Sequence, residues 1–257
     1  MGGEDAAAAV RAEESASGGV DVWSDAVESH APDHLLVMVH GILGSQQDWQ
    51  YAANEFVKQL PDDVIVHCSE KNASLLTLDG VDVMGERLAD EVLDVISRKP
   101  ELTKISFLAH SVGGVAARYA IAKLYRHPND TLDGKTKGTI CGLEAVNFIT
   151  VATPHLGSRG NKQWVESLSQ KYPHIVHEEY SEEINDDKCH DSMKDCDLDI
   201  LEEKMVTGLR RVSWEKVDVS FHTSMTSFAA HSIIQVKYAF MNEGADVIQH
   251  IIDHFQV

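Results

Sequence analysis

The sequence predicts an α/β protein with a mostly parallel sheet that carries helices on both faces. Apolar runs at 34–41, 104–110 and 145–154 have the length and near-continuous apolar character of strands buried on both sides. Between these runs, 45–60 and 81–99 show the apolar spacing of amphipathic helices. Strands that alternate with helices through short connections imply right-handed crossovers, and therefore parallel strands.

Proline residues mark where the first two helices end. The helix at 45–60 stops before Pro61, and the helix at 81–99 stops before Pro100, because proline cannot continue a helix. The remaining elements are expected as strands at 63–69 and 208–221 and helices at 114–127 and 245–255, with weak helical character over 161–180.

The domain organisation is expected to be a tail followed by one domain. Residues 1–33 are rich in Ala, Glu, Ser and Gly and lack periodicity, which is typical of a disordered tail. Residues 34–257 form the expected domain, and length alone does not demand a second one. Within it we expect a regular core at 34–160, an irregular acidic segment at 161–207, and a last strand, a histidine loop and a closing helix at 208–257.

Charge and targeting features restrict the partners. A formal net charge of −19 argues against nucleic acids and anionic membrane surfaces, although much of the excess lies in the acidic stretch 178–203. No apolar run approaches the roughly 20 residues that span a bilayer. The N-terminal residues lack the features of a signal or transit peptide, and the four cysteines are expected to be reduced thiols. The expected location is cytoplasmic.

Ser111 is the candidate nucleophile. It lies in Ala-His-Ser-Val-Gly, one residue away from the G-x-S-x-G pattern of a nucleophile elbow, between an expected strand and an expected helix. Ala109 and Gly113 are small enough for the close approach that this turn requires, and Gly114 allows the helix to pack against the strand. The alternative is an ordinary buried serine on a glycine-rich turn.

An elbow enzyme also needs backbone N–H groups for a developing oxyanion. The residue after the nucleophile, Val112, supplies the first, and the loop after the first strand supplies the second. That loop is His40-Gly41-Ile42-Leu43-Gly44, where the glycines allow it to curl over the site and Ile42 is the candidate donor. The alternative is a plain turn between a strand and a helix.

Three stretches carry a family resemblance: LLVMVHGILGS, FLAHSVGGVAARYA and FITVATPHLGSRGN. Through them, residues 35–160 resemble the plant form of a lipase-like serine esterase family of α/β-hydrolases, domain of unknown function 676. The Thr-Pro-His-Leu-Gly block at 153–157 is the most diagnostic part. The resemblance implies an α/β-hydrolase fold and a Ser–Asp–His hydrolase of carboxylic esters, with acyl lipids as substrates and neither a metal nor an organic cofactor.

The resemblance also directs the search for the catalytic histidine. The chain order of this fold is Ser, acid, His, and His231 in SFAAHSIIQV lies between the last expected strand and the last helix. Family members carry their histidine in a similar Ala-His setting, and His222 is the alternative. The residues expected to be structural are His40, His110, Pro154 and His155.

The triad acid has no assigned residue. The family places it in Asn-x-x-x-Asp-x-x-Val, after a strand that precedes the histidine, and this segment is absent from the sequence. The resemblance therefore implies that an internal block, with a strand and cap segments, is missing after residue 163. Conceivable substitutes are Asp195, Asp197 and Asp199, whereas Asp218 lies inside an expected strand and is a poor candidate.

Two groups of histidine or cysteine residues contain side chains that can bind a metal. Cys189-His190 and Cys196 have a spacing that fits no common zinc pattern, so a flexible acidic loop is favoured. His250 and His254 lie four residues apart on a helix without a third ligand, which favours solvated or capping roles. No metal is expected.

The expected function is hydrolysis of a small-molecule acyl ester or lipid through an acyl-enzyme on Ser111. The expected partners are that substrate and, peripherally, lipid; neither nucleic acid nor a transmembrane segment is expected. One alternative is a truncated, catalytically impaired isoform with a binding or regulatory role, or none. Another keeps the serine chemistry in an acyltransferase or thioesterase.

Overall fold

The computed structural model describes residues 10–15, 19–24, 31–128, 137–156, 174–181, 206–221, 229–238 and 240–257. They belong to two compact units. The first combines Met1–Pro154 with His231–Val257, and the second is His155–Ala230. The single domain expected over 34–257 therefore divides into two units.

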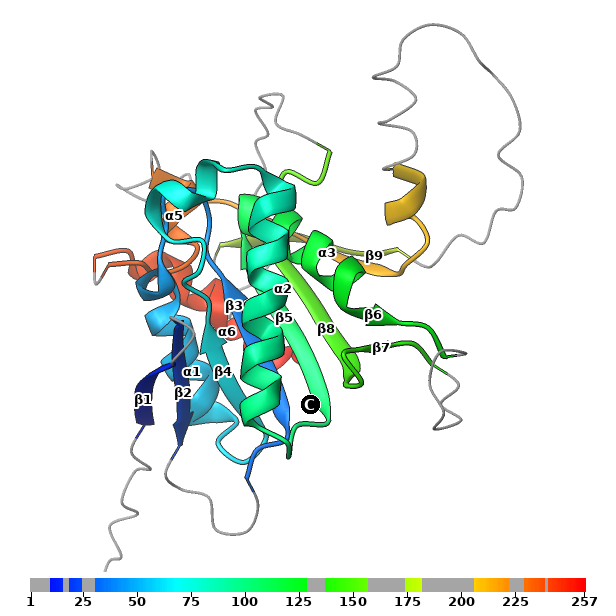
Figure 1. The fold of residues 1–257 in the computed structure, drawn as a ribbon. Helices are drawn as coiled ribbons and strands as arrows, with labels where there is room; N and C mark the ends of the chain where they lie inside the picture. Colours follow the sequence, from blue (N-terminus) through cyan, green and yellow to red (C-terminus); the bar gives the residue numbers. More distant parts are fainter. Residues whose placement is uncertain are drawn as a thin grey trace, which may run out of the picture. The chain divides into compact units, whose positions relative to one another are not determined.

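A six-stranded sheet forms the centre of the first unit, in the order β1-β2-β4-β3-β5-β8 (Figure 1). The strands β4, β3, β5 and β8 are parallel, whereas β2 pairs antiparallel with both β1 and β4. The bounds are β1 Val10–Ser15, β2 Gly19–Ser24, β3 His34–Val39, β4 Val64–Cys68, β5 Lys104–His110 and β8 Glu144–Val151.

Helices cover both faces of this sheet, as predicted. The pair α2 and α3 packs on one face, and α1 and α6 lie on the other (Figure 1). Their bounds are α1 Gln50–Gln59, α2 Val81–Arg98, α3 Val112–Leu124 and α6 Ala245–Asp253. Shorter elements are η1 Gln46–Trp49, η2 Ser74–Leu78, β6 Tyr125–Arg126, β7 Thr139–Ile140, α5 Ala230–Ile233 and η5 Asn242–Gly244.

The core explains why the apolar runs of β3 and β5 are continuous. In β3, Leu35 and Val37 face the α2–α3 side, where they join a cluster with Leu88 of α2. On the other side, Phe56 of α1 meets the ring of Phe255 edge-on at 5.1 Å between centroids. A strand with both faces buried takes apolar residues at most positions, and the buried polar pair His34 and Ser106 is joined by a hydrogen bond of 2.8 Å. The expectation of a doubly covered parallel sheet is therefore confirmed.

The expected tail at 1–33 is wrong for the residues of β1 and β2, which form an antiparallel hairpin at the edge of the sheet. Val20 pairs with Cys68 and Val22 with Val66 of β4. In β2, Asp21 lies between Val20 and Val22, and this alternation is too short to stand out in a polar segment.

The second unit contains a two-stranded antiparallel sheet of β9 Ile175–Ser181 and β10 Trp214–Val219. This corrects one expectation, because β9 lies where weak helical character was expected. The strand expected at 208–221 is present as β10, which pairs with β9. In β10, half-buried Val217 and Val219 flank exposed Asp218. This alternation is typical of an antiparallel strand with one solvent-exposed face.

The strand β8 is the last strand of the main sheet in the described part of the chain. Most of its residues, including Phe148, are partly buried or exposed, and only Val151 is buried, whereas every residue of β3 is buried. A pocket of about 590 Å³ lies beside it, lined by β8 residues and by Ile121 and Tyr125 near the end of α3. The described sheet is thus less well covered at β8 than at its centre.

Candidate active site

Ser111 lies at the sharp turn between β5 and α3. Its backbone is left-handed, with φ 53° and ψ −133°, a conformation that costs a non-glycine residue energy. The Ser111 amide donates to the Val151 carbonyl of β8 at 2.9 Å, which fixes the turn against the neighbouring strand. This geometry is the strand–Ser–helix turn that the sequence predicted.

Small residues around Ser111 are required by close backbone approach. A Cβ on Gly113 would overlap the His40 carbonyl oxygen, and a Cβ on Gly41 would lie 2.9 Å from the Ser111 Cβ. Gly114 packs against Thr153, and Ala109 is fully buried. The loop after β3 and the first turn of α3 can therefore approach Ser111 only with these residues.

The structure brings His231 to Ser111 across 120 positions of sequence. His231 is the second residue of α5, and its Nε2 lies 2.9 Å from the Ser111 Oγ. Partial burial of its ring lowers the pKa of His231 below its ordinary value, which favours the neutral imidazole at pH 7. A neutral Nε2 without a proton can accept the hydrogen of the serine hydroxyl.

His110 holds the segment that carries His231. Burial lowers the pKa of His110 to about 4, so its ring is neutral. With Nε2 protonated, this ring donates to the His231 backbone carbonyl at 2.7 Å, and the two ring centroids lie 4.5 Å apart. His110, expected to be structural, thus contacts the candidate base directly.

An ion pair ties the same segment to the loop after β3. The ammonium of Lys237 lies 2.7 Å from Oδ1 of Asp48 in η1, and the Asp48 side chain is almost fully buried. Gly44 faces the second carboxylate oxygen, and a Cβ there would approach it to 2.5 Å. No sequence pattern pointed to this pair, because 189 positions separate its members.

The two expected oxyanion donors lie next to Ser111. Val112 is the first residue of α3, where helical N–H groups have no partner within the helix. Ile42 directly follows Gly41, and no hydrogen bond among the described residues uses its amide. His40 is buried, and its Nδ1–H donates to the Gly41 carbonyl at 3.0 Å. This hydrogen bond is consistent with the structural role expected for His40.

Within the described part of the chain, no carboxylate forms a hydrogen bond or an ion pair with the His231 ring, and burial alone lowers its pKa. Asp218 lies in β10, as expected, with an exposed side chain. The other candidates lie outside the described residues: His222, Asp195, Asp197 and Asp199, together with Cys189, His190 and Cys196.

The remaining candidates occupy separate positions. Pro154 follows β8 and is half-buried, and His155 lies in the second unit with its ring 5.8 Å from that of Trp214. His250 is buried in the last turn of α6, and its ring lies 4.0 Å from that of exposed His254. Of the expected solvated or capping roles, the solvated one is therefore wrong for His250. His250 lies on the buried face of α6, together with Val247 and Ile251.

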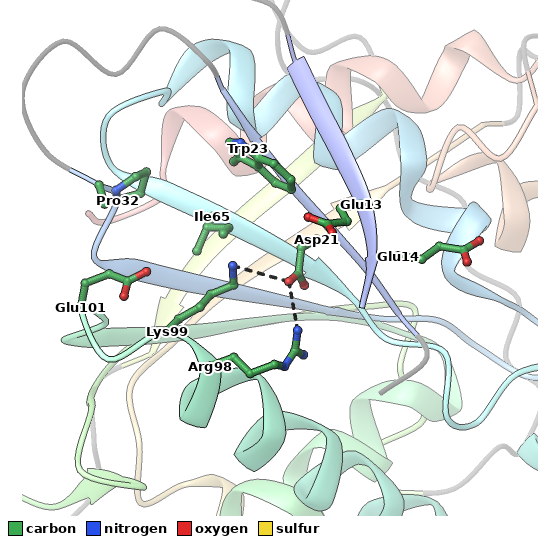
Figure 2. Close-up of a pocket in the computed structure, with 10 residues that line it drawn as sticks. Glu13, Glu14, Asp21, Trp23, Pro32, Ile65, Arg98, Lys99 and Glu101 are labelled. Atoms are coloured by element: carbon green, nitrogen blue, oxygen red, sulfur yellow. Dashed lines mark ion pairs between the residues drawn. The ribbon is translucent and has the colours of Figure 1, made fainter. Parts of the chain in front are cut away.

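A pocket of about 690 Å³ lies at the opposite end of the sheet, beside the N-terminal hairpin (Figure 2). It is bordered by Pro32 before β3 and Glu101 before β5, whereas Ser111 follows β5. Figure 2 shows Asp21 paired there with Lys99 at 3.6 Å and with Arg98 at 3.9 Å. Among the described residues that line this pocket there is no serine, cysteine or histidine.

A buried charged network that the sequence did not reveal lies behind that pocket. The ring of His67 in β4 contacts Asp21 through Nδ1 at 2.6 Å and Glu91 of α2 through Nε2 at 3.1 Å. Glu91 also accepts from the Ser69 hydroxyl at 2.6 Å and from the Glu70 amide at 3.0 Å. This network connects the hairpin, the sheet and α2.

The parallel sheet with helices on both faces and the strand–Ser111–helix turn define an α/β-hydrolase fold. Residues 29–185 match the family described as "Putative serine esterase (DUF676)". This match extends over more than half of the chain, which therefore belongs to that family. None of the helices in the described residues combines the length and apolar character that a membrane crossing requires.

Two yeast proteins are similar to this chain. "Putative lipase ROG1" of Saccharomyces cerevisiae is 30% identical over 146 residues, which cover 54% of this chain and 20% of that protein. "Putative lipase C4A8.10" of Schizosaccharomyces pombe is 32% identical over 136 residues, which cover 49% and 16%. The chain thus spans about a fifth or less of the length of these relatives.

Solved structures give partial matches. The mature Bacillus licheniformis lipase BlEst2 is 22% identical, with coverage of 52% of this chain and 47% of that chain and a TM-score of 0.36. Aspergillus fumigatus lipase B is 14% identical, with coverage of 53% and 30% and the same TM-score of 0.36. The sheet, the elbow and the family match define the fold of this chain.

Proposed function

We propose that this protein hydrolyses carboxylic esters through an acyl-enzyme on Ser111, with His231 as general base. The observation that carries the proposal is the 2.9 Å approach of the His231 Nε2 to the Ser111 Oγ. A nucleophile and a base within hydrogen-bonding distance, with the serine on a strand–helix elbow, are the arrangement that activates a hydroxyl.

The reaction follows from this geometry. As the Ser111 Oγ attacks the ester carbonyl, its proton passes to the His231 Nε2, and the carbonyl oxygen becomes an oxyanion that accepts from the Ile42 and Val112 amides. The C–O bond to the alcohol then breaks, and the imidazolium returns its proton to that alcohol. A water molecule, deprotonated by His231, attacks the acyl-enzyme and releases the acid and free Ser111.

Acyl lipids are the proposed substrate class. The family is described as an esterase family, and both yeast relatives carry the word lipase in their names. The proposed route uses only a hydroxyl, an imidazole and backbone amides, so it requires no metal ion or organic cofactor.

A second candidate is a catalytically impaired member of the family with a binding or regulatory role. It is favoured by one observation, that no described carboxylate reaches the His231 ring. In the serine-protease template, loss of the acid's function lowers kcat by about 10⁴. Such a protein would acylate Ser111 slowly and could release the acyl group to water or to another acceptor at a low rate.

A fluorophosphonate probe, which modifies activated serines, tests the proposal. We expect labelling of the purified protein, loss of labelling in Ser111→Ala, and retention in Ser97→Ala, which alters an exposed serine on α2. His231→Gln should slow labelling strongly because it removes the base. Folded protein that resists the probe, or Ser111→Ala protein that still reacts, would contradict the esterase mechanism.

A further inference from the structure

A cluster of exposed apolar side chains lies next to the proposed active site. Five of them come from two short segments, the loop after β3 and η2, and we call them the leucine-rich surface: Ile42, Leu43, Leu75, Leu76 and Leu78. Leu75 is 71% exposed, far more than a leucine in a packed core. Exposed apolar groups that gather in one place mark interaction sites more often than scattered ones do.

Two hydrogen bonds hold the two segments together. The Leu43 amide donates to the Thr77 hydroxyl at 2.9 Å, and the Ser74 amide donates to the Gly44 carbonyl at 2.8 Å. The surface is therefore preformed, and it starts at Ser111, because the backbone of Gly41 lies against that residue.

Backbone strain accompanies this exposure. Leu43 has φ 54° and Ser74 has φ 57°, both in the left-handed region that residues with a side chain avoid. Each of these residues also makes one of the two hydrogen bonds between the segments. The fold thus maintains an unfavourable conformation at two positions of a surface that buries little, which is typical of functional loops.

The surface carries no charge of its own. Residues 41–47 and 73–78 contain no acidic or basic side chain in a chain that is 25% charged. The charges that directly follow the two segments are paired, Asp48 with Lys237 and Asp79 with Arg87 at 2.6 Å, whereas Lys71 lies two positions before the second segment. With a net charge of −19, the protein is repelled by anionic surfaces, so an uncharged partner fits best.

We propose that the leucine-rich surface docks the protein on an uncharged lipid surface and so delivers ester substrates to Ser111. The choice of a lipid surface as the partner rests on the proposed function of the protein. Apolar side chains that enter the boundary between headgroups and acyl chains gain free energy by leaving water, and this gain needs no attraction of charge.

Vesicle flotation tests this docking without requiring catalysis. The protein is mixed with phosphatidylcholine vesicles, and the bound fraction is compared for wild type, the double variant Leu75→Gln/Leu78→Gln, and Leu93→Gln. Leu93 is the matched control, because it is an exposed leucine on α2 that lies about 18 Å along the helix from its first residue. Circular dichroism checks that each variant is folded.

We expect the wild-type protein to bind and the double variant to lose at least about tenfold in partition, since partial burial of two leucines is worth that much. Leu93→Gln should bind like wild type, and replacing part of the phosphatidylcholine by phosphatidylserine should weaken binding. Absence of wild-type binding, equal binding by the double variant, or stronger binding to anionic vesicles would overturn the proposal.

Two further measurements separate the remaining outcomes. Light scattering that shows a wild-type dimer and a Leu75→Gln/Leu78→Gln monomer, without vesicle binding, would assign the surface to a second copy of the chain and overturn lipid docking. Fluorophosphonate labelling reports the serine chemistry separately. Vesicle binding without labelling would support docking and contradict the esterase mechanism, whereas labelling without vesicle binding would overturn docking alone.

Discussion

The buried ring of His67 should make a large contribution to stability, and its replacement is the perturbation that the structure predicts in most detail. His67→Gln keeps a polar side chain but removes the positive charge between Asp21 and Glu91. The side chain of Glu91 is fully buried and that of Asp21 is 7% exposed. Breaking such a buried ionic group leaves uncompensated charge and costs about 3–5 kcal/mol.

The pKa of His67 gives a second value for the contribution of its charge to the free energy of unfolding. Burial alone would lower it, but the hydrogen bonds and charges of the two carboxylates raise it from 6.5 to about 9. A raised pKa means that the folded state binds the proton more tightly than the unfolded chain does. The corresponding stabilisation is about 3 kcal/mol; it is complete below pH 6.5 and is lost as pH rises through 9.

Urea unfolding at pH 6, 7 and 9.5 measures both effects. At pH 7, His67→Gln should unfold at a clearly lower urea concentration than wild type, and the stability of wild type should fall between pH 6 and 9.5 more than that of the variant. Lys58→Gln is the control, because the exposed Lys58–Glu55 pair is worth only about 0.5 kcal/mol. A His67→Gln protein as stable as Lys58→Gln, or a wild-type stability independent of pH, would refute this reasoning.

Three further predictions concern the proposed site. Gly113→Ala should lower fluorophosphonate labelling and destabilise the protein by about 1–3 kcal/mol, because its Cβ would overlap the His40 carbonyl; wild-type labelling and unfolding would contradict this. His110→Ala should slow labelling more than His110→Gln, whose amide can donate to the His231 carbonyl; equal rates in the two variants would exclude the positioning role. Because burial lowers the pKa of His231, the labelling rate of wild type should rise with pH to a plateau with a midpoint below 6.5, and a midpoint above 7 would argue against this neutral base.

The parts of the fold that could be predicted from the sequence are those set by local pattern. The strand β5 is expected at 104–110 and has these bounds, because a run buried on both faces is mostly apolar and stands out from its surroundings. Ser111 was found through the small residues around it, which the backbone geometry of the turn requires.

The parts that could not be predicted depend on contacts between distant segments. The hairpin of β1 and β2 lies in a polar stretch, and its position depends on pairing with β4 and on the contact between Asp21 and His67, 46 positions apart. The same holds for Lys237 and Asp48, since no spacing in a sequence identifies partners that meet only after folding.

The contacts that position His231 differ from those that would set the tautomer and the basicity of its ring. His110 holds the backbone carbonyl of His231, and Lys237 anchors the residues that follow it, so neither contact uses the ring Nδ1. The Nε2 accepts a proton from Ser111 only in the tautomer with Nδ1 protonated. A carboxylate at Nδ1 would favour that tautomer and stabilise the imidazolium, whereas the 2.9 Å approach to Ser111 is already present among the described residues. Addition or loss of an acid should therefore change the rate of acylation more than the position of the base, and this is why labelling of Ser111 is expected even from a slow enzyme.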